Sequence, residues 1–244
     1  MDTARRRPVR TALVACGLLA VLSSAPVSSE PAAPAPRTAE ATPYRPLPPN
    51  SAAYAMAIPA VGADGVRRTI NTGLDRDDTV WHVRSAWNVA ALNCMGSQYR
   101  PILAGYAAFL KKYARELAAV NKRIEAKYRS AAAREAQNTK VYNYFATPAA
   151  MGAMCPVALA VASEWQKAPP TDLAAFAKAT LPRYDAVYLD FFDAYDRYRA
   201  DSAAWDAKYG ALYGSTQPGY VAVHGRENQS PDSRSGNRTA SHPH

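Results

Sequence analysis

The sequence is poor in the side chains that most often carry catalysis or bind metals. Only four of its 244 residues are histidine and three are cysteine, and one histidine, His82, lies in the part predicted to fold. The sequence contains no G-x-S-x-G, H-E-x-x-H, P-loop or G-x-G-x-x-G motif, and no His/Cys cluster with metal-ligand spacing. The enzyme classes that those motifs define are therefore not indicated, and we predict neither a metal nor a cofactor.

Long hydrophobic runs are also missing. The longest run, residues 12–22, has 11 residues and follows a segment with four arginines between positions 5 and 10. This run is too short to cross a bilayer as a helix, but it has the length and flanks of an export signal. We therefore predict a signal peptide at 1–29, a location in the periplasm or cell envelope, and no transmembrane helix in the mature chain.

A lipid anchor at Cys16 is the alternative for this N-terminal segment. Residues 13–17, LVACG, resemble a bacterial lipobox, in which the cysteine is lipidated and becomes the first residue. Against this alternative, the hydrophobic run continues past Cys16 instead of ending there.

The two flanking regions have compositions that do not suit a packed core. Residues 30–50 hold seven prolines, which is typical of an extended linker. Residues 215–244 lack hydrophobic periodicity and contain the other three histidines, which predicts a disordered tail. One folded domain is left at 51–214, a length that fits a single hydrophobic core.

The densest structural signal is the segment 75–96. Asp75 has the position of an N-cap, and two further acids follow in the first turn, where the helix dipole favours negative charge. Apolar residues then recur at spacings of three and four up to Cys94, and Gly96 can end the helix. Because its stripe includes small alanines, we predict a central helix on which others pack closely.

Most of the remaining sequence also has helical periodicity. The longest such stretch runs from Ser97 to about Lys140, with a break expected near Ser130 or Asn138. Pro156 predicts a kink or a restart, Pro169-Pro170 and Pro182 predict breaks, and a final helix is expected at about 183–208. Alternation before residue 70, with a turn near Asp64-Gly65, predicts a small hairpin. The fold class is mainly α, a bundle of about five helices with a small N-terminal β-hairpin.

One helix face is strongly basic. Residues 100–140 contain ten basic and three acidic residues, and we select Lys111, Arg115, Lys122 and Arg129 as candidate contacts for an anionic partner. The alternative is that this face pairs internally with the acidic last helix. Residues 51–214 together carry 20 basic and 15 acidic residues, a moderate excess that does not indicate nucleic-acid binding.

The cysteines that remain after export are Cys94 and Cys155. Two cysteines in an exported protein predict one disulfide, and a pair of free buried thiols is the alternative. No C-x-x-C motif is present, so a redox role is not indicated.

The segment around the central helix resembles a group of uncharacterised exported proteins of Gram-negative bacteria. The resemblance rests on the W-H-x-R-x-A-x-N-V-A-A-L-x-C pattern at 81–94 and on the later Tyr-rich helix at 181–196, and it would cover about 54–199. It implies export, a helical fold and the pairing of Cys94 with Cys155, and it supplies no catalytic residue.

The function that these observations predict is that of an exported, non-enzymatic binding or scaffold protein. Its basic helix face would contact an anionic envelope component or a partner protein. An envelope hydrolase is the alternative, with His82 and Arg84 as the candidate catalytic residues, because any His-dependent site in the folded part must use His82.

Overall fold

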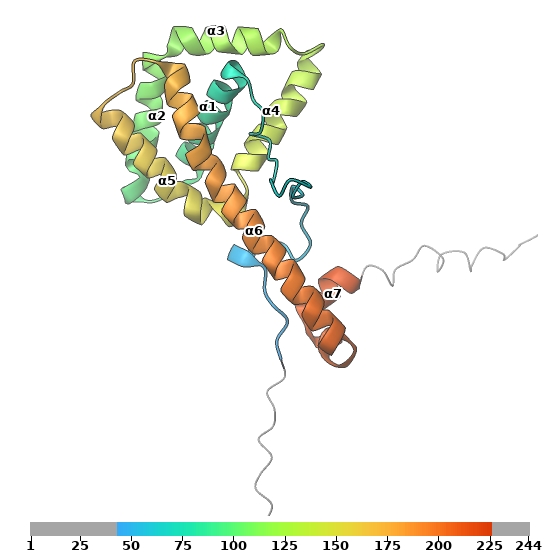
Figure 1. The fold of residues 1–244 in the computed structure, drawn as a ribbon. Coiled ribbons are helices and arrows are strands. Elements are labelled where there is room, and N and C mark those ends of the chain that lie inside the picture. The colour runs from blue at the N-terminus through green and yellow to red at the C-terminus, as the bar shows by residue number, and fades with distance from the viewer. Residues whose placement is uncertain (1–42, 226–244) are drawn as a thin grey trace, which may run out of the picture. The chain divides into compact units, whose positions relative to one another are not determined.

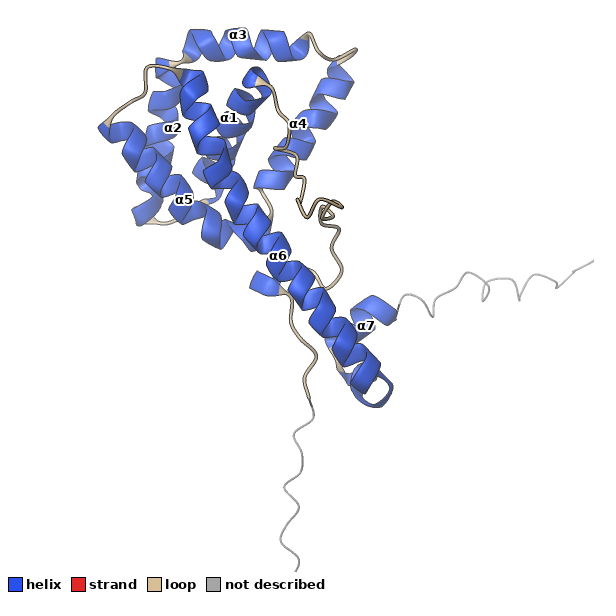
Figure 2. Ribbon diagram, viewed as in Figure 1, coloured by secondary structure: helices blue, strands red, loops and turns tan. Residues whose placement is uncertain are grey.

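The computed structural model describes residues 43–225, which fall within one unit by their contacts. This part of the chain is helical and contains no strand (Figures 1 and 2). Seven α-helices and three short 3-10 helices follow one another: η1 Pro49–Ser51, α1 Arg76–Asn93, η2 Ser97–Tyr99, α2 Arg100–Lys112, α3 Ala114–Glu125, α4 Ala131–Phe145, α5 Pro148–Lys167, α6 Leu173–Tyr213, η3 Gly214–Thr216 and α7 Pro218–His224.

Helix α1 is central, as predicted, and it packs against α2, α3, α4, α5 and most extensively α6. The Asp75 carboxylate caps it by accepting hydrogen bonds from the backbone N–H groups of Asp77 and Asp78. Ala86 and Ala90 are fully buried on its inner side, and their small side chains let neighbouring helices approach closely.

The predicted long basic helix is three helices. The first break is at Tyr113, whose ring is buried and whose hydroxyl donates to the carbonyl of Pro170. The second break lies at 126–130, and Ser130 caps α4 by accepting from the N–H of Ala133. The break near Ser130 was predicted. The break at Tyr113 was not, because the apolar spacing continues through it.

The predicted break at Pro182 is wrong, and of the two outcomes predicted at Pro156, a kink or a restart, the restart does not occur. Helix α5 runs through Pro156 without restarting, and α6 runs through Pro182 for 41 residues. A proline inside a helix costs one hydrogen bond and some bending, and here the packing of both helices against their neighbours outweighs that local cost. Helix α6 begins at Leu173, and its N-cap is Asp172, whose carboxylate accepts from two backbone N–H groups.

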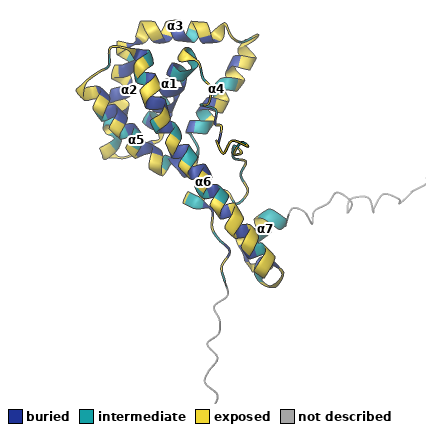
Figure 3. Cartoon of the chain, viewed as in Figure 1, coloured by how far each residue is buried: buried dark blue, intermediate teal, exposed yellow. Residues whose placement is uncertain are grey.

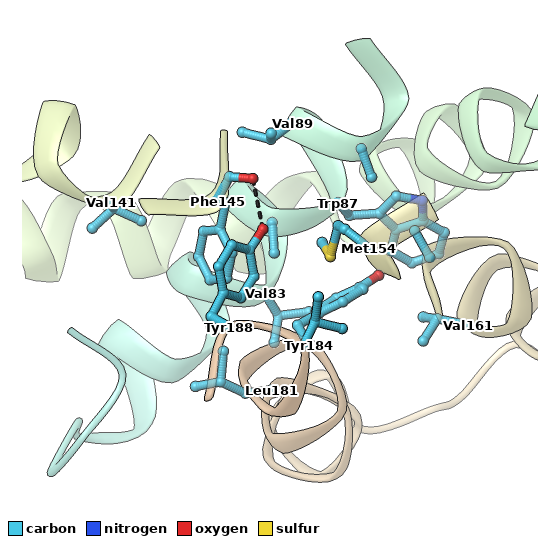
Figure 4. Packing of buried hydrophobic residues seen from close by; sticks show 14 of the residues in the cluster. Val83, Trp87, Val89, Val141, Phe145, Met154, Val161, Leu181, Tyr184 and Tyr188 are labelled. Atoms are coloured by element: carbon cyan, nitrogen blue, oxygen red, sulfur yellow. Dashed lines mark hydrogen bonds between the residues drawn. The ribbon is translucent and has the colours of Figure 1, made fainter. Parts of the chain in front are cut away.

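The core lies where α1, α4, α5 and α6 meet. Val83, Trp87, Phe145 and Met154 are fully buried there, and the Tyr188 hydroxyl donates to the carbonyl of Phe145 at 2.6 Å (Figure 4). Because a buried tyrosine needs a partner for its hydroxyl, this bond fixes how α6 sits against the end of α4.

The predicted disulfide between Cys94 and Cys155 is present. It joins the residue after α1 to the middle of α5 across a separation of 61 residues. A disulfide is typical of an oxidising compartment, so this bond is compatible with export.

The predicted hairpin is reduced to one antiparallel bridge between Val61 and Arg67. The expected turn forms, with Gly65 at φ +76°. The Arg67 side chain ties this bridge to α6, because its guanidinium binds Asp193 at 2.9 Å and Asp196 at 2.5 Å.

Both ends of the folded part extend beyond the predicted limits of 51 and 214. Arg45, expected in the linker, is buried against Asp206 of α6. Beyond Gly214, helix α7 packs on the end of α6, because Gly210 and Gly214 leave room for the Tyr220 ring. The predicted signal peptide, Cys16, most of the linker and residues 226–244 lie outside the described residues.

Candidate functional site

The candidate catalytic histidine is buried and belongs to a network of hydrogen bonds whose other members are buried or half-buried. His82 Nδ1 lies 2.7 Å from Asn71 Oδ1, and Asn71 Nδ2 donates to Asp185 Oδ1 at 2.6 Å. The hydroxyls of Thr69 and Tyr144 also donate to Asp185, at 3.0 and 2.6 Å. Since the Asn71 amide nitrogen faces Asp185, its oxygen must accept from His82, so the His82 proton is on Nδ1.

The electrostatics of this network favour a neutral histidine. Burial, with only 3 % of His82 exposed, lowers its pKa to about 4, and the charge of Arg134 acts in the same direction. The carboxylates of Asp78 and Asp185 oppose this shift without cancelling it. Burial, followed by the hydrogen bond to Asp185, raises the pKa of Tyr144 well above its usual range. At neutral pH the network is therefore a set of neutral donors around one carboxylate.

The network connects four separate segments. His82 comes from α1, Asn71 and Thr69 from the preceding loop, Tyr144 from α4 and Asp185 from α6. Its hydrogen bonds hold these segments together, and the buried position of His82 keeps it away from solvent. The arrangement therefore suits a structural role better than a catalytic one, because a substrate could not reach His82 here.

The second candidate catalytic residue, Arg84, points elsewhere. Its guanidinium stacks over the Trp81 ring at 4.6 Å from the centroid and donates to the Tyr142 hydroxyl at 2.8 Å. A second guanidinium, that of Arg134, also stacks on Trp81, at 4.8 Å. Trp81 therefore has close contacts with two cations, an arrangement that the sequence spacing did not reveal.

Arg134 differs from the other buried arginines among residues 43–225. Arg45, Arg67 and Arg134 are 6 %, 8 % and 8 % exposed. Arg45 binds Asp206 at 2.7 Å, and Arg67 binds the carboxylates of α6 described above. Arg134, in contrast, donates only to amide oxygens, those of Asn138 and of Asn121, and no described carboxylate is within ion-pairing distance of it. Buried charges are normally paired, so this guanidinium is unusual.

A cavity of about 450 Å³ lies against Arg134, between the end of α3 and the first half of α4. Its polar lining includes both amides that bind Arg134. Two glutamates also line it, Glu125 and Glu135, and Glu125 accepts a hydrogen bond from Asn121 Nδ2 at 2.5 Å. The full lining is Asn121, Glu125, Tyr128, Ser130, Ala131, Arg134, Glu135 and Asn138.

The predicted basic residues Lys111, Arg115, Lys122 and Arg129 are all exposed, and we call this set the basic face. They lie at the end of α2, on α3 and in the loop after it, and the outer side of α3 is exposed in Figure 3. Within the described part of the chain, none of the four forms an ion pair.

Two neighbouring basic residues, in contrast, are neutralised internally. Arg123 binds Asp77 at 2.6 Å, and Lys127 binds Asp75 at 2.5 Å and Asp78 at 2.8 Å. These acids belong to the start of α1. The predicted internal pairing therefore occurs for part of the basic segment, but its partner is α1 and not the acidic last helix.

A further cavity, of about 650 Å³, was not predicted from the sequence. Asp206 lies in its wall and contacts His224 at 3.1 Å as well as Arg45. Burial alone would raise the pKa of Asp206, but the hydrogen bonds from Arg45 and His224 hold it below its usual value. Arg45 and His224 come from the proline-rich linker and the tail, where composition gives no sign of burial.

The described residues were also compared with the requirements of a metal site and of a membrane span. Among residues 43–225, no group of three or more His, Cys, Asp or Glu side chains could hold a metal ion. Over the same range no single helix has the length and hydropathy of a membrane span, although α4 and α5, which meet at a bend of 79°, pass that test together.

The fold and these sites define an all-helical, disulfide-linked protein with unpaired cations at its surface and in one cavity. No protein-family model, curated protein or solved structure matches the chain. The resemblance to uncharacterised exported proteins therefore stays a prediction.

Proposed function

We propose that this chain is an exported, non-enzymatic binding protein that attaches to an anionic surface of the cell envelope through its basic face. The observation that carries the proposal is that some basic residues of this segment form ion pairs and their neighbours do not. Arg123 and Lys127 are neutralised by α1, whereas the four residues of the basic face are exposed and unpaired within the described chain. Helix α3 keeps its apolar side in the core and so has a fixed orientation.

The expected affinity is modest. Each Lys or Arg close to an anionic membrane surface contributes about 1 kcal/mol, so four of them supply roughly 4 kcal/mol. The two acids among the exposed side chains of α3, Glu116 and Glu125, subtract from this total. Such binding is peripheral and reversible. It weakens with salt because the Debye length is only about 8 Å at physiological ionic strength.

The hydrolase alternative has less support. Its two candidate residues point in different directions: His82 is buried against Asn71, and Arg84 is bound to Tyr142. A substrate would reach His82 only after the loop that carries Thr69 and Asn71 had moved away from α6.

The test is co-sedimentation of the folded domain with phosphatidylglycerol vesicles and with phosphatidylcholine vesicles across a salt series. We expect binding to the anionic vesicles alone, with an affinity that falls steeply as salt rises. The double variant Arg115→Glu, Lys122→Glu should lower the affinity at least ~100-fold, because it removes two attractive contacts and adds two repulsive ones.

The matched control is Lys167→Glu, Arg197→Glu, which makes the same change in net charge on α5 and α6. A loss of similar size in this control would show that total charge decides binding, and not the basic face. Absence of salt-sensitive binding to anionic vesicles would also overturn the proposal.

A further inference from the structure

The cavity between α3 and α4 has an unusual balance of charge. Its lining carries one cation, Arg134, and two carboxylates, Glu125 and Glu135. Arg134 is buried, and only neutral amides and the Trp81 and Tyr128 rings surround its guanidinium. The two glutamates are exposed at the rim.

This balance restricts what can bind. A simple anion would compensate Arg134 but would be repelled by both glutamates. A simple cation would suit the glutamates and leave the buried guanidinium without a counter-ion. A ligand that carries both charges satisfies the two ends at once, because its carboxylate can form a charge-assisted hydrogen bond with Arg134 while its ammonium group stays near the rim.

The volume of the cavity also limits the size of the ligand. Its volume of about 450 Å³ falls in the range of small-molecule sites, roughly 300–1,000 Å³, and leaves room for more than a single small amino acid. The remaining polar groups, which include Asn138 and Ser130, can bind peptide N–H and C=O groups. Ser130 also caps α4, so the helix start adds a weak positive field on the same side as Arg134.

We propose that this cavity binds a short zwitterionic peptide of about dipeptide size, with the carboxylate on Arg134 and the ammonium group facing Glu125 and Glu135. The site is separate from the basic face, and the proposal does not depend on attachment to an anionic surface. The guanidinium of Arg134 also stacks on the Trp81 ring, which does not line the cavity.

The first experiment is calorimetric titration of the folded domain with three matched probes. Alanyl-alanine carries both charges, N-acetyl-alanyl-alanine only the carboxylate, and alanyl-alaninamide only the ammonium group. We expect saturable binding of alanyl-alanine and at least tenfold weaker binding of each blocked form. Equal binding of all three probes, or no binding of alanyl-alanine at millimolar concentration, overturns the proposal. Tight binding of inorganic phosphate overturns it in favour of a simple anion site.

The variants then assign the two ends of the ligand. Arg134→Gln should weaken alanyl-alanine binding by about 30-fold, since a hydrogen bond to a charged group contributes about 2 kcal/mol. Glu135→Gln should weaken it about threefold and reduce the preference over the N-acetylated probe, because the group is exposed.

Arg197→Gln and Glu116→Gln are the matched controls, because both residues are exposed and neither lines the cavity. Since Glu135 is exposed, its variant tests the site even if Arg134→Gln fails to fold. Unchanged discrimination between alanyl-alanine and the N-acetylated probe in Glu135→Gln contradicts the assignment of the ammonium end.

Discussion

The buried histidine network makes the stability of the fold depend on pH in a defined window. His82 has an ordinary pKa near 6.5 in the unfolded chain and about 4 in the folded protein. Below pH 6.5 the unfolded state therefore binds a proton that the folded state does not, and the free energy of unfolding falls as the pH falls toward 4. Above pH 6.5 both states hold a neutral imidazole and the effect is absent.

The size of the effect follows from the two pKa values. The lower pKa in the folded state reduces the free energy of unfolding by about 2 kcal/mol between pH 7 and pH 5. The reduction reaches about 3 kcal/mol once the pH is below both pKa values. Solvent screens this effect very little, because only 3 % of His82 is exposed. The carboxylates with lowered pKa values, among them Asp75 and Asp77, lose their contribution at lower pH, mostly below 5.

The matched variant is His82→Asn, which keeps an amide donor toward Asn71 and cannot titrate. Urea unfolding followed by circular dichroism at pH 7.5, 6.5, 5.5 and 5.0 gives the free energy of unfolding of each protein. We expect wild type to lose about 2 kcal/mol more than the variant over this range, while all carboxylate effects cancel in the comparison. Parallel curves for the two proteins would refute a neutral buried His82.

Two further perturbations test the other supports of the fold. Replacing both Cys94 and Cys155 by serine should cost about 4 kcal/mol, less any strain in the bond, because the disulfide closes a loop of about 60 residues, and thermal unfolding with and without reductant would measure it. Arg67→Met should cost about 2 kcal/mol by urea unfolding, since it leaves Asp193 and Asp196 without their cation but half in solvent. A cost below about 0.5 kcal/mol would show that the Arg67 pairs only offset their own desolvation.

The parts of the fold that the sequence predicts correctly depend on local chemistry. The cap at Asp75, the apolar stripe of α1 and the break near Ser130 were predicted, and each is decided by residues close together in the sequence. The disulfide was also predicted, because two cysteines in the folded part allow only one pairing.

The errors have a common physical origin in tertiary packing. Pro182 was expected to end a helix and Pro156 to kink or restart one, but contacts with other helices keep α5 and α6 continuous. The break at Tyr113 interrupts an apolar stripe that looks continuous, because the buried ring is held by Pro170 from a distant loop. Neither outcome is visible from local propensity, since both are decided by residues far away in the sequence.

The candidate sites also depend on tertiary packing that local sequence patterns do not reveal. Arg134 has the spacing of one more exposed cation on a basic helix, but the change of direction at 126–130 starts a new helix and turns it inward. There its planar guanidinium stacks on Trp81, as a lysine in the same place could not. The burial of Arg45 and His224 is equally hidden, because they come from segments whose composition is typical of linkers and tails.

The breaks at Tyr113 and at 126–130 also explain why the basic residues of one segment lie in different environments. A single helix over 97–140 would carry its cations along one continuous face, where all would be screened by salt alike. Because the chain turns twice, Arg123 and Lys127 are brought to the acids of α1, the basic face stays in solvent, and Arg134 becomes a buried charge. The excess of seven positive charges over residues 100–140 is therefore divided among three environments, and only the exposed part can act on a distant anionic surface.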